Sequence, residues 1–288
     1  MGMTTNTLET PEVDLVHDVQ GPLPTADGRP PLFLIGQPMT AEGFRALTAR
    51  FPDRTVITYD PRGLGRSVRK DGRTDNDPET QARDVHALIE ALGAGPVEMF
   101  ASSGGAVTAL ALVAAYPGDV TTLVAHEPPM ASVLPDAGAA ARALAAVQDV
   151  YQAKGNNAGM AAFIAMTAWQ GEYDDAYFAQ PAPDPAAFGM PSEDDGTRDN
   201  PLLSGASRPI TAYEPDVAAL NAAPTRVVLA VGEETGDAFT ARTARATAAL
   251  LGGDAVVFPS HHGGFAGPEG GYPGKPEEFA QKLREVLG

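Results

Sequence analysis

One serine stands where its hydroxyl could act as a nucleophile. Ser103 lies in residues 101–105 (Ala-Ser-Ser-Gly-Gly), directly after the apolar run 97–100 and directly before the apolar segment 106–116. A strand that turns sharply into a helix at such small residues projects the serine hydroxyl above the sheet. The free N–H groups at the start of that helix, Gly104 first, can stabilise negative charge beside it. This stretch therefore predicts a nucleophile for acyl-transfer chemistry.

A serine hydroxyl needs a base within hydrogen-bond reach to become reactive near neutral pH. The chain has five histidines, and two of them, His261 and His262, lie in the glycine-rich stretch 260–265 after the apolar run 255–258. If that run is a parallel strand, its carboxyl end shares a sheet edge with Ser103. Adjacent histidines cannot easily face one metal ion, so we expect a base here and no metal site.

The elements that must position these residues follow an alternating pattern. Short apolar runs bounded by turn residues predict strands, and each is followed by a helical pattern, so we expect an α/β protein with a mostly parallel sheet. Residues 13–19 predict an antiparallel edge strand. The other expected strands are 32–35, 55–59, 97–100, 120–125, 226–231 and 255–258, and the expected helices are 41–50, 78–92, 106–116, 238–251 and 276–287.

The alternation stops between residues 132 and 215. Residues 136–154 and 160–170 have helical patterns, whereas 181–191 is rich in proline and 192–200 is acidic and polar. Large apolar side chains, among them Phe163, Met166 and Trp169, exceed what a solvated excursion needs. We therefore predict a core domain of residues 1–131 and 216–288 with a lid (cap) insertion, 132–215, whose apolar side chains contact the substrate. They would equally suit a homodimer interface.

Composition limits the partners that this protein can have. The 288 residues carry a formal net charge of −17 at pH 7, which disfavours nucleic acids and anionic membranes as partners. With no cysteine, the chain has no thiolate nucleophile, disulfide or cysteine-ligated metal. Neither a signal-peptide pattern nor an apolar run of about 18 residues is present. We expect a cytoplasmic protein that acts on a small molecule.

With two further motifs, the chain resembles the α/β-hydrolase superfamily over nearly its whole length. Residues 59–67 (Tyr-Asp-Pro-Arg-Gly-Leu-Gly-Arg-Ser) are similar to the D-x-R-G-x-G-x-S loop after the family's fourth strand, and residues 35–38 (Ile-Gly-Gln-Pro) occupy the place of its H-G-x-P motif. The resemblance implies the α/β-hydrolase fold, with helices flanking the sheet and an inserted helical lid. It also implies that His262 is the base and that the Gln37 and Gly104 N–H groups form the oxyanion hole.

The acid that orients the histidine has two candidate places in this family. The common one follows the seventh strand, where Thr235 cannot serve and Glu234 and Asp237 are the nearby carboxylates. The other follows the sixth strand, where Glu127 stands in residues 125–129 (Ala-His-Glu-Pro-Pro), as in some dehalogenases and the fungal zearalenone-lactonase group. We expect Glu127, with Glu234 or Asp237 as the alternative acid.

Ser103 lies at the strand-to-helix turn where related dehalogenases and epoxide hydrolases have aspartate. A serine at this place implies an acyl-enzyme. We therefore predict a cofactor-free serine hydrolase that cleaves a small-to-medium apolar carboxylic ester or lactone with Ser103, His262 and Glu127. One alternative is perhydrolase, haloperoxidase or hydroxynitrile-lyase chemistry on the same Ser–His–acid arrangement. Another is a non-catalytic binding protein that keeps the fold.

Overall fold

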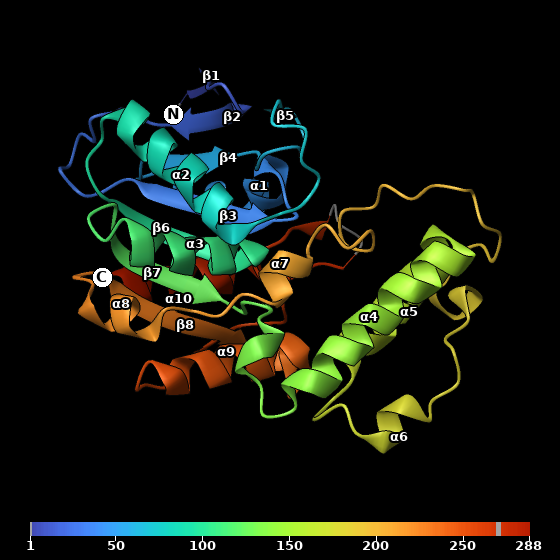
Figure 1. Ribbon diagram of the computed structural model, residues 1–288. Helices are drawn as coiled ribbons and strands as arrows, with labels where there is room; N and C mark the ends of the chain where they lie inside the picture. The colour runs from blue at the N-terminus through green and yellow to red at the C-terminus, as the bar shows by residue number, and fades with distance from the viewer. Residues whose placement is uncertain (1, 269–271) are drawn as a thin grey trace.

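The computed structural model describes residues 2–268 and 272–288 and contains one mixed sheet (Figure 1). Within these residues the sheet has nine strands in the order β1-β2-β4-β3-β6-β7-β8-β9, with β5 paired to β2. From β4 to β9 all neighbours are parallel. The strands are β1 (Met3–Glu9), β2 (Val13–Gln20), β3 (Leu32–Gln37), β4 (Val56–Tyr59), β5 (Val68–Arg69), β6 (Val97–Ser103), β7 (Val120–His126), β8 (Arg226–Gly232) and β9 (Val256–Phe258).

The antiparallel end of the sheet corrects one prediction. β2 is antiparallel, as expected, but it is not an edge strand, because β1 pairs along its whole length from Met3–Gln20 to Glu9–Asp14. Almost all of β1 is exposed, and it therefore lacks the apolar residues that mark a buried strand. Its threonines favour a strand without revealing which face is covered.

Helices cover both faces of the parallel part (Figure 1). α2 (Pro78–Leu92), α3 (Gly104–Ala115) and α8 (Val217–Ala222) pack into the core cluster on one face, and α1 (Arg45–Thr48) and α10 (Pro276–Leu287) pack into the cluster on the other. The predicted helix 41–50 is a 3₁₀ turn, η1 (Ala41–Phe44), followed by α1. α9 (Phe239–Leu250) packs against β8.

Local sequence explains the helix that matches its prediction best. Asp77 caps α2 by accepting a hydrogen bond from the Thr80 N–H, Pro78 occupies the first turn, and Gly93 ends the helix with φ 59°. α3 differs, since ten of its residues are buried. A helix that is apolar on all sides lies inside the protein, and α3 therefore carries its N-terminus to the middle of the sheet edge.

The loop after β4 holds the end of β3 in place. The Asp60 carboxylate accepts hydrogen bonds from the Ala41 N–H (2.9 Å) and the Arg66 N–H (2.9 Å), and the Ser67 hydroxyl donates to the Asp60 carbonyl oxygen (2.6 Å). These residues belong to the D-x-R-G-x-G-x-S motif. In this structure the motif fixes the path of the chain just beyond Gln37.

Between β7 and β8 the chain forms a helical segment, which we define as residues 131–222. Its two long helices, α4 (Ala137–Lys154) and α5 (Asn156–Ala168), pack against each other and extend away from the sheet (Figure 1). The shorter elements are η2 (Ala131–Val133), α6 (Asp175–Phe178), η3 (Pro185–Phe188), α7 (Arg208–Thr211) and α8. The segment has its own apolar cluster, which includes Tyr151, Met166 and Tyr173. The predicted insertion limits of 132 and 215 fall inside this segment.

Candidate active site

Ser103 occupies the tight turn that the sequence predicts between a strand and a helix. It is the last residue of β6 and the residue before α3, with φ 56° and ψ −130°. A non-glycine residue rarely adopts such a conformation. The turn depends on small neighbours, because a Cβ at Gly105 would lie 2.6 Å from Gly36 Cα, and one at Gly104 would lie 2.8 Å from the Gln37 carbonyl oxygen. Close packing of α3 on β3 thus holds the turn.

Glu127 meets His262 just beyond the end of β7. Glu127 Oε2 lies 2.6 Å from His262 Nδ1 and also accepts from the Thr240 hydroxyl (2.7 Å), while Oε1 accepts from the Gly232 N–H (2.9 Å). The Glu127 side chain is fully buried, and its backbone has φ 48°. Three hydrogen bonds and a strained backbone therefore fix this carboxylate in one position.

The surroundings of Glu127 favour its ionised form. Burial alone would raise its pKa, but the hydrogen bond and charge of His262, together with His126 and the Thr240 hydroxyl, hold the pKa well below its usual value. An ionised carboxylate accepts hydrogen bonds only, so His262 donates through Nδ1. The other ring nitrogen, Nε2, then carries the lone pair that a base needs.

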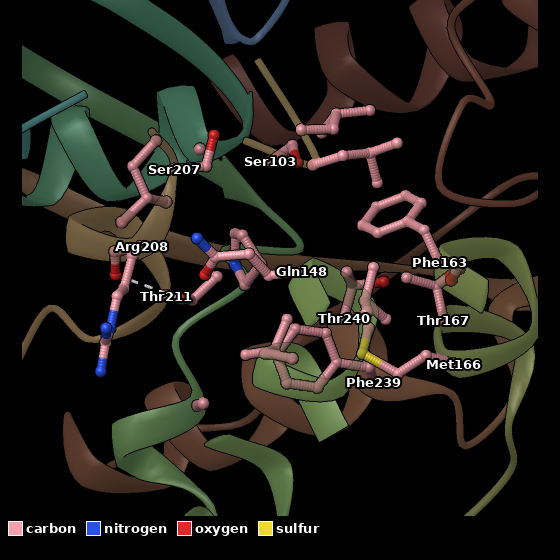
Figure 2. A pocket seen from close by; sticks show the side chains of 18 of the residues that line it. Ser103, Gln148, Phe163, Met166, Thr167, Ser207, Arg208, Thr211, Phe239 and Thr240 are labelled. Carbon is pink, nitrogen blue, oxygen red and sulfur yellow. Dashed lines mark hydrogen bonds between the residues drawn. The ribbon is translucent and has the colours of Figure 1, made fainter. Parts of the chain in front are cut away.

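Ser103 and His262 both line one cavity of about 1000 Å³, and Figure 2 shows the Ser103 side of it. Gln37 and Gly104, the predicted oxyanion-hole residues, line it as well. Ser103 Oγ has no hydrogen-bond partner among the described residues, so it is not bonded to His262 here. In unliganded enzymes such contacts commonly tighten only when substrate is present.

The alternative acids and the alternative base point elsewhere. Glu234 pairs with Lys275 (2.5 Å) and Asp237 with Arg245 (3.5 Å), both on the protein surface. His261 Nδ1 accepts from the Gly263 N–H (3.0 Å), and its Nε2 lies 3.2 Å from the Pro273 carbonyl oxygen. Of the candidates weighed from the sequence, the structure thus brings together Glu127 and His262.

The predicted substrate-contacting residues divide into two groups. Phe163 and Met166, from α5, line the cavity (Figure 2). Trp169 does not belong to the described lining, because its ring packs against Tyr177 (5.4 Å between centroids) and its Nε1–H donates to the Glu172 carbonyl oxygen (3.0 Å). These two contacts hold the indole outside the described lining.

Much of the cavity wall gave no sequence signal. Small side chains of α4, which an alanine-rich helix presents without any chemical motif, form one side, and Phe239 and Thr240 of α9 close another (Figure 2). These residues lie far apart in the chain. The sequence indicates only that these helices carry apolar residues on one side, which a fully solvated helix would not need.

The described residues contain neither a metal-binding cluster nor a membrane-spanning helix. No cluster of three or more histidine, cysteine, aspartate or glutamate side chains in residues 2–268 and 272–288 could hold a metal ion. Likewise, none of the helices described in those ranges has the length and apolar character needed to cross a membrane.

Comparison with known proteins identifies the family. The model of the alpha/beta hydrolase fold family matches residues 32–176, and the chain therefore belongs to this family of hydrolases. An uncharacterized hydrolase of Bacillus subtilis, YraK, is 30% identical over 135 residues, which are 46% of this chain and about half (48%) of that protein.

Solved structures agree over the full chain. A thermophilic esterase from Thermogutta terrifontis has a TM-score of 0.62 and 22% identity, covering 100% of this chain and 98% of the other. The alpha/beta hydrolase MGS-M2 from a Medee basin deep-sea metagenome library has a TM-score of 0.68 and 16% identity, covering 98% and 97%. At such identities the likeness shows the fold, which has esterases among its neighbours.

Proposed function

We propose that this protein is a serine hydrolase that cleaves a small-to-medium apolar carboxylic ester or lactone. The observation that carries the proposal is the placement of Ser103 and the His262–Glu127 pair on one cavity. A nucleophile, a base and an orienting acid are the three groups that acyl transfer requires.

In the proposed reaction, Ser103 Oγ attacks the carbonyl carbon while His262 Nε2 accepts the hydroxyl proton. Glu127 holds the ring and stabilises the resulting imidazolium. Backbone N–H groups of Gly104 and Gln37 donate to the tetrahedral oxyanion. The C–O bond to the alcohol then breaks, and His262 protonates the departing oxygen. Water, deprotonated by His262, attacks the acyl-enzyme and releases the acid and Ser103.

The character of the cavity supports an uncharged substrate. Its wall consists largely of alanine, leucine and other apolar side chains, with hydroxyl and amide groups as the main polar features. Arg208 is the one arginine or lysine among the described lining residues, which is fewer basic groups than a clamp for a phosphate or a polyanion needs. We further propose that the helical segment serves as the lid, because Phe163, Met166 and Leu144 supply cavity wall from above the sheet edge.

The test compares two neighbouring serines. Ser103→Ala should lower kcat for p-nitrophenyl acetate by about 10³-fold or more and abolish labelling by a fluorophosphonate probe. Ser102→Ala is the matched control: Ser102 is buried and lies 3.4 Å from His126 Nδ1 instead of lining the cavity, so this variant should keep both activities.

Three results would contradict the proposal. Full ester turnover by Ser103→Ala would show that Ser103 is not the nucleophile. Cyanohydrin cleavage without an acyl-enzyme burst would favour lyase chemistry. Ligand binding without turnover, unchanged in Ser103→Ala, would favour a binding protein that retains the fold.

A further inference from the structure

The side-chain amide of Gln37 is buried without a partner. Only 2% of Gln37 is exposed, and neither Oε1 nor Nε2 has a hydrogen bond to any described residue. Leaving one such group unpaired in a protein interior costs free energy, and buried amides are nearly always bonded. The Gln37 amide therefore keeps a donor and an acceptor that the described residues leave unused.

Gln37 lies beside the nucleophile. In the parallel pairing of β3 with β6, Gln37 is the partner of Ser103, and neighbouring strands are about 4.8 Å apart. Gln37 Cβ lies 3.1 Å from where a Cβ on Gly104 would be. Gln37 also lines the cavity on which Ser103 opens. Its amide is thus within one side-chain length of the reacting hydroxyl.

The protein around Gln37 supplies no polar partner. The Cβ position of Gly104, 3.1 Å from Gln37 Cβ, also lies 2.9 Å from Ile210 Cδ1 of α7, and Pro38 follows Gln37 in the chain. A second glutamine of the cavity behaves differently, since Gln148 Nε2 donates to the Ser204 carbonyl oxygen. Of these two cavity glutamines, the one next to Ser103 is thus the one with a free amide.

We propose that the Gln37 amide recognises a hydroxyl or amide group that the substrate carries on the carbon chain beside the scissile ester. This inference rests on the proposed function. A glutamine amide offers one donor group and one acceptor, and a hydroxyl accepts from Nε2 and donates to Oε1. A plain alkyl chain satisfies neither atom. Gln37 thus acts through its side chain as a specificity-determining residue, separately from its backbone N–H.

The experiment measures ratios of kcat/KM for ester pairs that differ by one hydroxyl. Methyl 2-hydroxybutanoate against methyl butanoate tests the acyl side, and 2-hydroxyethyl butanoate against ethyl butanoate tests the alcohol side. Gln37→Met keeps the length of the side chain and removes its polar atoms. Any general damage to the oxyanion hole cancels in the ratio.

The matched control is Gln81→Met. Gln81 is also buried with both amide atoms unpartnered, but it belongs to α2 and does not line the cavity. We expect Gln37→Met to lower the hydroxy-to-plain ratio about tenfold on one of the two arms, the value of about one good hydrogen bond, and Gln81→Met to leave both ratios unchanged.

Equal ratios in wild type and Gln37→Met on both arms would overturn the proposal. A melting temperature lowered by several degrees in Gln37→Met, with unchanged ratios, would assign the amide to a structural water instead. If wild type cleaves none of the four esters, the proposed function is decided by turnover of p-nitrophenyl acetate alone. Gln37 is then tested by NMR titration with 2-hydroxybutanamide and butanamide: a preference for the former that Gln37→Met removes supports recognition, and no preference overturns it.

Discussion

The carboxyl edge of the sheet and the helical segment above it shape the same cavity in different ways. At the edge, the three non-glycine residues with positive φ among those described, Ser103, Glu127 and Ser260, all follow or end strands next to the candidate site. The helical segment contributes ordinary helices with small and apolar side chains. Two of the three candidate catalytic residues, Ser103 and Glu127, thus lie on strained backbone, whereas the helical segment shapes the cavity with ordinary helices.

This difference has an energetic reason. Holding a non-glycine residue in a rare conformation costs of order 1–3 kcal/mol, which only a rigid surrounding structure can sustain. The buried sheet provides that rigidity through parallel pairing on both sides of β6 and β7. We therefore expect substitutions at the edge to change reaction rates and substitutions in the helical segment to change substrate preference.

The largest effect should come from Glu127→Gln. The amide keeps an acceptor for Gly232 but cannot stabilise a charged His262, so kcat for p-nitrophenyl acetate should fall about 10³- to 10⁴-fold. Glu234→Gln and Asp237→Asn are the controls and should stay within twofold of wild type. The opposite pattern would show that the acid comes from the loop after β8.

The joint between the two regions should be the next most sensitive place. Arg242 of α9 forms a buried ion pair with Asp136, at the start of α4, and donates to the Gly171 carbonyl oxygen (2.8 Å). Arg242→Met leaves the Asp136 charge unpaired and should lower the free energy of unfolding by about 3 kcal/mol, measured with urea. Arg73→Gln, which breaks an exposed pair with Asp75, should leave the urea midpoint unchanged. Equal urea midpoints for the two variants would show that the Arg242–Asp136 pair does not stabilise the contact between the two regions.

Acid should weaken the sheet edge through His126. Burial lowers the pKa of His126 from 6.5 to about 4. Between these values the unfolded chain binds a proton that the folded protein excludes, so the free energy of unfolding falls as the pH drops from 6.5 towards 4, by about 3 kcal/mol. His126→Leu should flatten this dependence in urea titrations at several pH values. Parallel pH profiles for the two proteins would show that His126 is not the source.

The smallest effect should come from the wall of the helical segment. Phe163→Ala removes part of the apolar wall, so a longer acyl chain buries less surface (Figure 2). The KM for p-nitrophenyl octanoate should rise about tenfold, and that for the acetate should change less than twofold. Trp169→Ala, outside the described lining, is the control. An equal rise for both esters would mean that Phe163 supports the fold instead of the chain-length preference.

Features that depend on local sequence could be predicted, whereas features that depend on contacts between distant parts of the chain could not. Strands, the helix 78–92 and the turn at Ser103 depend on local patterns, and the structure confirms them to within a few residues. The meeting of Glu127 with His262 joins residues 135 positions apart, and the sequence left it open between two loops. The cavity wall follows from how α4, α5 and α9 pack, which no short motif encodes. The pairing of β1 was missed because its exposed polar residues resemble a loop.

In the described structure the loop after β8 forms no hydrogen bond or ion pair with His262, and this has a consequence for how the protein is held together. Glu127 reaches the imidazole from β7, so the stretch 233–238 needs to deliver no carboxylate. It contacts the chain after α5 instead: Asp237 N–H donates to Gln170 Oε1, Gly171 N–H donates to the Asp237 carbonyl oxygen, and Gln170 pairs with Ala238. These bonds tie the helical segment to the sheet edge, so a movement of the segment away from the edge at this point would have to break them.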